Sequence, residues 1–326
     1  NAPAPGDAID RFIRQLAAVP SVPHSATAPA EATSNDAAAG LLRHVLRDPS
    51  WRRLEAAWRG VDRFVRRLDM ADGGVRLELL DCRADEALAD LAAAGGEAAR
   101  CALVPALRGD GRGCDVLVSG EEFGPSLAEM SLLGGLAGLA ESQGAVLIAG
   151  AAPSLVGLST SGEAEVLASP QARVWRALRE SALGPRIGLT FPRLLARLPY
   201  GPRDEPVSAF AFDELADAGG GALHELLVWR SAAIDAAMLL AQDASRRGGD
   251  AGARSRIELE DLPAFIDRSG DEPRLQAVAE LYLGEGDVRA LRAAGFIALE
   301  SDRRVPKARL SGWRSIAADG ADLCGP

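Results

Sequence analysis

Residues 115–149, DVLVSGEEFGPSLAEMSLLGGLAGLAESQGAVLIA, contain the pattern that decides the fold class. An apolar run at Asp115–Val118 and a second one at Ala145–Ala149 are each short enough to be a buried strand. Between them, Leu127–Gln143 is long enough and apolar enough to be a helix packed on a core. Because strand, helix and strand in this order are typical of a crossover unit in a parallel sheet, the stretch predicts an α/β fold.

The same alternation of strand and helix continues on both sides of this stretch. Before it, Val75, Leu77 and Leu79 alternate with polar residues, as in a half-buried strand. The other predicted elements are a helix at Ala84–Ala94, a helix at Pro170–Ser181, a strand at Arg186–Thr190, a helix at Leu223–Arg246, and a helix at Asp287–Ala293 followed by the apolar run Phe296–Leu299. The chain is therefore expected to hold a mixed sheet, or mixed sheets, flanked by helices.

The first 35 residues are expected to form a short helix and a flexible linker. The helix candidate is Asp7–Val19. Its apolar face consists of Ile9, Phe12, Ile13 and Leu16. Residues 20–34, rich in Pro, Ser, Thr and Ala, are typical of a linker. Asp36 is predicted to cap a helix that ends near Asp48, and a longer helix is predicted to begin at Pro49.

The helix after Pro49 carries a continuous apolar stripe. The stripe residues are spaced 3, 4, 3, 4 and 3 apart, and they are Trp51, Leu54, Trp58, Val61, Val65 and Leu68. This spacing puts all of them on one side of the helix, so we expect the stripe to be core or interface. If it is core, Trp58→Ala should cost about 3–5 kcal/mol. Several arginines lie elsewhere around the helix, either as a solvated basic face or as a docking face for an acidic partner.

Composition excludes several classes of protein. The 326 residues are 48% apolar and 25% charged, which is typical of a folded protein. A net charge of −10 gives no global attraction to nucleic acid or to an anionic membrane. No apolar stretch is long enough to span a bilayer. The four cysteines show no C-x-x-C spacing and are expected to be reduced thiols of a cytoplasmic protein.

Motifs of catalysis are missing from the sequence. The glycines of 116–124 lack the Lys-Ser/Thr pair of a phosphate loop, and Gly157–Gly162 lacks the G-x-S-x-G spacing of a serine hydrolase. The three histidines have no Asp or Cys patterned around them. We therefore predict no catalytic, cofactor-binding or metal-binding residues and no enzyme activity.

One long run resembles a known family. Residues 174–202, VWRALRESALGPRIGLTFPRLLARLPYGP, resemble a run found in the large subunit of the type VI secretion contractile sheath. Further blocks resemble the same family in the same order, and they are Leu54–Gly60, Val116–Phe123, Ile148–Gly157, Phe210–Glu214, Trp229 with Ala232 and Ala233, and Gly295–Leu299. The resemblance covers Asp36–Leu299.

The resemblance implies a structural function. Large sheath subunits are α/β proteins that pair with a small sheath subunit, polymerise around an inner tube of stacked rings, and contract to expel that tube. The family also implies disassembly by a hexameric AAA+ ATPase that engages an N-terminal helix, here the one with Ile9, Phe12, Ile13 and Leu16. It further implies a sheath-like region at 36–300, as one body or as subdomains of 36–70 plus 200–300 and of 71–199, followed by a tail at 301–326.

Two features of the chain stay open at this point. Arg193 and Arg197, four residues apart, either present a fork to carboxylates or lie on a plain surface. The C-terminal tail diverges from the family pattern, and Val305–Ile316 either adds a strand to a neighbouring subunit or folds back with Trp313 buried. Together with the stripe, Arg193, Arg197 and Trp313 are the predicted interface residues.

Three functions are compatible with these observations. The first is a subunit of a contractile sheath, with a small subunit, neighbouring sheath subunits and an inner tube protein as partners. The second is an adaptor that keeps the sheath fold and binds a secretion partner without polymerising. The third is an α/β enzyme without a familiar motif, which would need a pocket with convergent polar groups.

Overall fold

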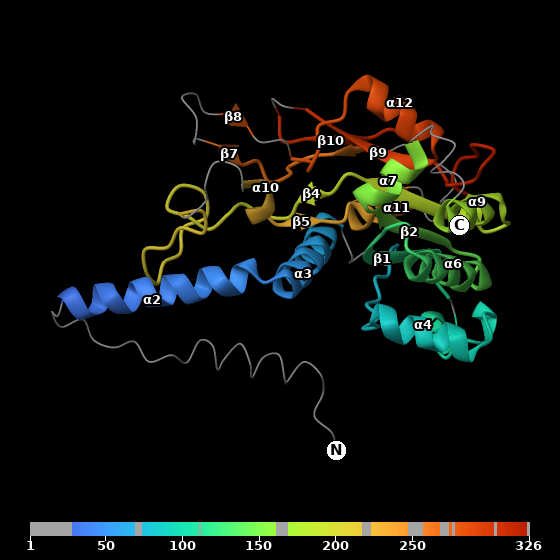
Figure 1. Ribbon diagram of the computed structural model, residues 1–326, viewed down its shortest axis with the longest axis horizontal. Coiled ribbons are helices and arrows are strands. Elements are labelled where there is room, and N and C mark those ends of the chain that lie inside the picture. Colours follow the sequence, from blue (N-terminus) through green and yellow to red (C-terminus); the bar gives the residue numbers. More distant parts are fainter. Residues whose placement is uncertain are drawn as a thin grey trace, which may run out of the picture. The chain divides into compact units, whose positions relative to one another are not determined.

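The computed structural model describes residues 28–68, 74–109, 111, 113–160, 169–216, 223–246, 257–267, 274–275, 278–302 and 305–324 (Figure 1). The chain divides into two units, residues 1–42 and residues 43–326. Helix α2 (Ala28–Arg47) begins in the first unit and ends in the second. The predicted helix at Asp7–Val19 and its four apolar residues lie outside the described residues.

A six-stranded mixed sheet is the centre of the second unit. The strands follow the order β1-β2-β3-β9-β10-β6. Their bounds are β1 Val116–Phe123, β2 Val146–Ala151, β3 Ile187–Phe191, β9 Phe296–Ser301, β10 Ala308–Leu310 and β6 Glu258–Leu259. The first four strands are parallel, and β10 is antiparallel to both β9 and β6. The predicted α/β class with a mixed sheet is confirmed.

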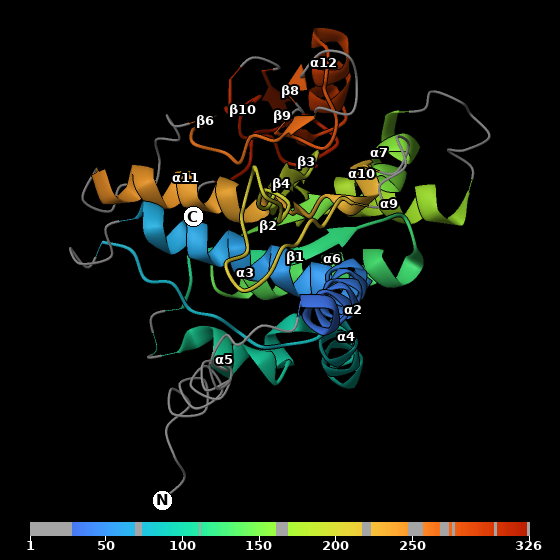
Figure 2. The same ribbon diagram turned by 90° about the vertical axis from the view of Figure 1, so that its left-hand side faces the viewer.

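Helices cover both faces of this sheet, as Figures 1 and 2 show. Along β2, Leu147 and Ala149 pack into one apolar cluster, whereas Val146 and Ile148 pack into the other. The first cluster includes residues of α4 (Ala84–Ala93), α6 (Leu127–Ser142), α9 (Pro170–Glu180) and α12 (Glu285–Ala293). The second includes residues of α3 (Pro49–Arg67) and α11 (Ala233–Arg246). Side chains alternate across a strand, so a strand buried on both faces is apolar throughout.

The remaining elements are short. Helical turns are η1 Ala98–Arg100, α5 Leu103–Arg108, α7 Pro153–Thr160, η2 Gly184–Arg186 and α10 Leu223–Leu226. Two small antiparallel pairs join β4 Leu194–Leu195 to β5 Trp229–Arg230 and β7 Ile266–Asp267 to β8 Arg274–Leu275. Local capping explains where the long helices begin. Asp48 accepts hydrogen bonds from the backbone of Ser50 and Trp51 at the start of α3, and Ser126 and Glu129 form a capping box at α6.

Several predicted elements need correction. Residues 75–79 are not a strand, because Val75 and Leu77 pack against the second cluster without joining the sheet ladder. The predicted linker is too long, since α2 already begins at Ala28 and Asp36 lies inside it. The predicted helix at 223–246 is interrupted at Trp229–Arg230, which pair with β4 instead. At residues 75–79 and at Trp229–Arg230, tertiary contacts outweigh the local pattern.

The C-terminal residues fold back onto their own sheet. β10 lies between β9 and β6, and the buried side chains that follow it include Trp313, Ile316 and Leu323. The backbone N–H of Ile316 donates to the carbonyl of Ile187, which ties the tail to the start of β3. Of the two arrangements predicted for the tail, this structure has the fold-back with Trp313 buried.

Candidate interaction surface

Helix α3 contacts the rest of its unit through a face that carries two small residues and one phenylalanine. Ala56, Gly60 and Phe64, four residues apart, are its buried residues. A Cβ atom at Gly60 would come within 2.8 Å of Cδ1 of Ile234 on α11. Gly60 therefore lies against the flexible end of the Ile234 side chain, and α3 lies close against α11.

A buried ion-pair cluster fixes the N-terminal half of α3. The guanidinium of Arg197 donates to Glu55 of α3 at 2.5 and 3.1 Å, and to Glu214 at 2.7 and 3.0 Å. Arg197 is only 7% exposed. Burial alone would lower the pKa of Arg197, but its hydrogen bonds to Glu214 and Glu55 raise that pKa overall. The charged forms of all three side chains are thus held together inside the protein.

A second ion-pair cluster fixes the C-terminal half of α3. Nε of Arg63 lies 3.1 Å from Oδ1 of Asp235 on α11, and Arg230 of β5 contacts the same carboxylate. Asp235 and Arg230 are almost completely buried. Arg63 also donates to the carbonyls of Glu260 and Asp261 at 2.6 and 2.9 Å. Held at both halves, α3 is a rigid element with a fixed outer face.

Most of the predicted stripe lies on the outer face of α3, and its side chains there are exposed. The exposed fractions are 45% for Trp51, 53% for Leu54, 56% for Trp58 and 45% for Val65. Val61 is partly buried, and only Leu68 at the end of the stripe is buried. Of the two alternatives predicted for the stripe, core and interface, the structure excludes the core for its exposed residues. We call Trp51, Leu54, Trp58, Val61 and Val65 the α3 stripe.

The stripe is exposed because α3 has a second apolar face, which packs inward. The stripe consists of large residues and dominates the sequence pattern, whereas the face that packs inward is made of Ala56, Gly60 and Phe64. Close helix packing favours small side chains, which contribute little to a hydrophobicity pattern. The i, i+4, i+8 spacing of Ala, Gly and Phe was the signal in the sequence that marks the inner face.

Arginines border the α3 stripe. Arg53 is exposed on one side of it, and Arg59 and Arg66 lie on the other with side chains 42% and 77% exposed. Arg59 donates to the hydroxyl of Tyr200 at 2.9 Å, and Arg66 pairs with Asp62 at 2.8 Å. Exposed side chains of this type are hydrated and contribute little to stability. Because Arg59 and Arg66 pair with Glu55 and Asp62 of the same helix, the border of the apolar surface carries charges of both signs.

A third cluster of charges joins four segments next to this helix. Arg193 forms a bidentate pair with Glu280, at 2.7 and 2.6 Å, and its Nε lies 3.5 Å from Glu122 of β1. Nε2 of His224 lies 3.0 Å from Glu280. Burial raises the pKa of Glu122 to about 7, against the opposing effect of Arg193. Glu122 is thus partly protonated near neutral pH.

The Glu122 carboxyl makes a testable contribution to the pH dependence of stability. Its pKa is raised from 4.5 in an unfolded chain to about 7, so the folded state binds more protons between these values. Stability should therefore fall as pH rises through this window, by at most about 3 kcal/mol. Urea unfolding at pH 5 and pH 8 should show Glu122→Gln gaining stability relative to the parent at pH 8. Parallel pH profiles for the two proteins would contradict the raised pKa.

The predicted interface residues are found in three different environments. The fork interpretation of Arg193 and Arg197 holds, but the carboxylates they bind belong to the same chain. Trp313 is 6% exposed in the second apolar cluster. Of the predicted interface residues, only those of the α3 stripe are available to a partner. Sequence spacing did not reveal the pairs of Arg197 with Glu55 and of Arg193 with Glu280, because these partners are distant in the chain.

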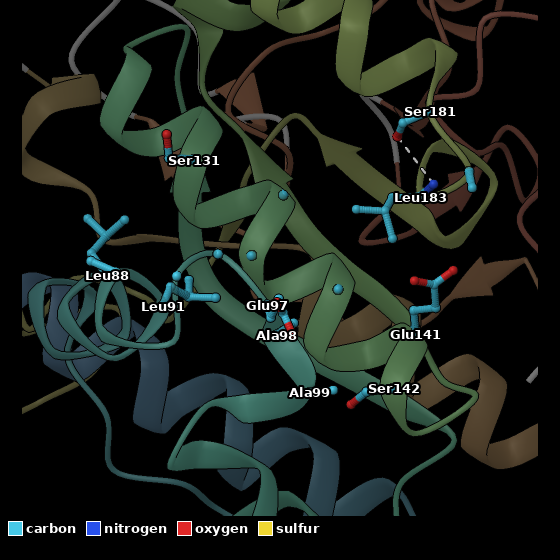
Figure 3. Close-up of a pocket in the computed structure, with 17 residues that line it drawn as sticks. Leu88, Leu91, Glu97, Ala98, Ala99, Ser131, Glu141, Ser142, Ser181 and Leu183 are labelled. Atoms are coloured by element: carbon cyan, nitrogen blue, oxygen red, sulfur yellow. Dashed lines mark hydrogen bonds between the residues drawn. The ribbon is translucent and has the colours of Figure 1, made fainter.

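A hollow of about 1010 Å³ lies on the other side of the sheet, between α4, α6 and residues 181–183 (Figure 3). Its floor includes Gly134, Gly135 and Gly138 of α6, and its charged lining residues are Glu97 and Glu141. The other lining residues are serine, glycine, alanine and leucine, and none is a histidine, cysteine, lysine or arginine. Within the described ranges, no group of three or more His, Cys, Asp or Glu residues is placed to hold a metal ion.

A membrane-spanning helix is likewise not found: none of the helices in the described part of the chain combines the length and apolar character needed to cross a bilayer.

Comparisons with known proteins agree with this arrangement. Residues 35–317 match the family model described as EvpB/VC_A0108, tail sheath N-terminal domain. The "Type VI secretion system sheath protein TssC1" of Pseudomonas aeruginosa is 30% identical over 219 residues. That match covers 64% of this chain and 43% of the relative, so it spans less than half of the relative's length.

Proposed function

Because the chain belongs to the tail sheath family of type VI secretion, we propose that it is a structural subunit of a contractile sheath and that the α3 stripe contacts another sheath subunit. The family is one of structural components, in agreement with the prediction that the chain is not an enzyme. In this proposal the subunit pairs with a small sheath subunit and polymerises around an inner tube whose expulsion it drives.

The exposed α3 stripe is the observation that supports the proposal. Two tryptophans, a leucine and a valine, each 45% exposed or more, lie on one face of a helix that ion pairs hold in place. Contiguous exposed apolar surface is typical of interaction sites, and tryptophans contribute strongly to binding energy. A rigid helix also loses little entropy when it binds.

The other proposed partners come from the family resemblance. They are neighbouring sheath subunits, the inner tube protein, and an AAA+ ATPase that would engage the N-terminal helix with Ile9, Phe12, Ile13 and Leu16. A cytoplasmic location belongs to the same proposal. Arg193, Arg197 and Trp313 are not part of the proposed contact, because their side chains already serve the internal clusters.

One observation favours the adaptor as a second candidate. Residues 308–324 pack on their own sheet, so this tail does not offer a free strand to a neighbouring subunit. Co-expression with the small sheath subunit of the same secretion system, followed by negative-stain microscopy, separates the two functions. Tubules support the sheath subunit, and a soluble complex without tubules supports the adaptor. Failure to bind the small subunit would contradict the sheath subunit.

Substitution of Trp58 tests the contact itself. Trp58→Ala removes a large exposed side chain, so we expect the free energy of unfolding to change by less than about 1 kcal/mol. Affinity for the small subunit should fall at least tenfold, as for a hot-spot residue. Calorimetric titration measures the affinity, and urea unfolding measures the stability.

A matched pair of leucines provides the control. Leu54 in the stripe and Leu127 on α6 are exposed to similar degrees, 53% and 51%. Leu54→Ala should weaken binding, whereas Leu127→Ala should not. Equal binding by both leucine variants and by Trp58→Ala would contradict the proposed contact.

A further inference from the structure

The central sheet has a free edge at β1. β1 is the outermost strand, and among the described residues β2 is its only strand partner. The backbone N–H of Val146 donates to the carbonyl of Asp115 at 3.1 Å, so the backbone groups of Asp115 face β2. Successive residues of a strand face opposite sides, so the N–H and C=O groups of Val116 and Val118 face away from β2. We call them the outer groups of β1, and an exposed row of such groups is a template for another strand.

An extended segment of the same chain lies next to this edge. Residues 75–80 lead into α4 (Figure 2). The side chains of Val75 and Leu77 pack against the second apolar cluster, which also holds the two outward-facing valines of β1. Between them, Nη2 of Arg76 donates to the carbonyl of Gly113, just before β1, at 3.2 Å. The segment thus alternates its side chains as a strand beside β1 would.

The segment also runs in the same direction as β1. Along α6, Gly135 lies against Leu91 of α4, and Gly138 lies against Ala98 of the following turn η1. Because the residue numbers rise together, the chain follows α4 and α6 in the same direction, on the same face of the sheet. Helix α6 returns the chain from the end of β1 to the start of β2. In the same way, α4 returns it from the end of residues 75–80 to the start of β1, as in a parallel crossover unit.

This orientation determines which backbone groups of the segment face β1. Parallel strands direct the backbone groups of residues on one face of the sheet to the same side. Val146 of β2, in the second cluster, directs its N–H toward the β1 side. Leu77, in the same cluster, therefore faces away from β1, whereas the backbone groups of Arg76 and Glu78 face it. Among the described residues, no backbone hydrogen bond joins residues 75–80 to β1. The segment has the orientation of a seventh strand without its hydrogen bonds.

We propose that residues 75–80 are a strap that closes on β1 in solution, by parallel pairing of the backbone of Arg76 and Glu78 with the outer groups of β1, and that the structure shows the open strap. A closed strap covers the free edge, so that a strand of another polypeptide has no place to pair. The strap is favoured over such a strand because the same chain holds it beside β1, which makes the pairing intramolecular. This inference does not depend on the proposed function.

Hydrogen exchange at single residues of the full chain tests the pairing. The amides of Arg76 and Glu78 should exchange at least tenfold more slowly than those of Leu77 and Leu79, after correction for intrinsic rates. The outer amides of β1 should be protected to the same degree. Equal exchange at all four residues of the segment would overturn the strap. Protection of the outer amides that rises with protein concentration would also overturn it, because a second copy would then cover the edge.

Two exposed positions provide a matched pair of variants. Glu78→Pro removes an N–H that faces β1, whereas Leu79→Pro removes one that faces away, and both side chains are exposed. Glu78→Pro should raise the exchange rate of the outer amides of β1 at least tenfold, and Leu79→Pro should leave it unchanged. Glu78→Ala controls for loss of the exposed ion pair with Arg76 and should behave like the parent. Equal exchange in the two proline variants would overturn the proposed pairing, and the test on the parent protein needs no variant to fold.

The protective role of the strap has its own test. Sedimentation velocity at rising protein concentration should show at least twice as much dimer and larger species for Glu78→Pro as for Leu79→Pro, because the open edge of β1 accepts a strand from another copy. Equal sedimentation of the two variants, with the outer amides exposed only in Glu78→Pro, would overturn the protective role.

Discussion

Deletion of residues 300–326 is expected to abolish cooperative folding. The deleted segment holds a strand of the central sheet and buried side chains, most of which belong to the two apolar clusters. They are Ala308, Leu310, Trp313, Ile316, Ala317 and Leu323. Their burial contributes roughly 10 kcal/mol, similar to the whole net stability of a domain. Circular dichroism should show no cooperative thermal transition, and limited proteolysis should degrade the shortened chain.

Single substitutions of two tryptophans test whether the loss of buried side chains, rather than truncation in general, prevents folding. Trp313 is 6% exposed and Trp58 is 56% exposed. Trp313→Ala should cost about 3–5 kcal/mol, in contrast to the small change expected for Trp58→Ala. A truncated protein that melts like the parent, or equal melting of the two tryptophan variants, would show that the tail is not part of the core. The tail would then be free to link subunits.

Removal of Arg197 is expected to have the second large effect. Arg197→Met keeps the apolar part of the side chain but leaves Glu55 and Glu214, with side chains 11% and 3% exposed, without their cation. A buried charge that loses its partner typically costs 3–5 kcal/mol. Because Glu55 belongs to α3, the helix should also lose its fixed position. We expect weaker binding of the small subunit even though Arg197 is not part of the stripe.

The double-mutant cycle with Glu214→Gln tests this mechanism. If uncompensated charge causes the loss, Arg197→Met with Glu214→Gln should be more stable than the sum of the two single losses predicts. The exposed pair of Arg66 and Asp62 is the control, and Arg66→Met should change stability by less than about 1 kcal/mol. Additive losses in the Arg197 and Glu214 cycle would mean that Arg197 acts through packing rather than through charge.

The sequence predicted the fold class because strands inside the sheet contain apolar runs. β2 and β9 are buried on both faces, so their runs stood out against polar surroundings. Predictions of secondary structure failed where the structure of a segment depends on contacts with residues distant in the sequence. Trp229 and Arg230 match a helical pattern locally, yet they pair with β4, and residues 75–79 alternate like a strand without pairing. Pairing across many residues cannot be derived from periodicity alone.

The candidate site was predicted in part. The 3-4 spacing identified the stripe on α3, but not whether it packs inside or is exposed, because hydrophobicity does not distinguish core from interface. Arg193 and Arg197 were identified from the sequence, but Glu280 and Glu55, which they bind, lie far away in it. Arg197, for example, binds Glu55, which precedes it by more than one hundred residues.

The place of β9 in the sheet has a consequence for the synthesis of the chain. β3 pairs with β9 in parallel, and Leu189 lies opposite Phe296, more than one hundred residues later. At typical translation rates β3 therefore waits roughly 5–20 s for its neighbour to be made. During that time its edge, formed by apolar residues, is open to wrong pairing with nascent chains nearby. Folding yield should depend on how quickly the ribosome completes the last third of the protein, and on chaperones that shield the edge until then.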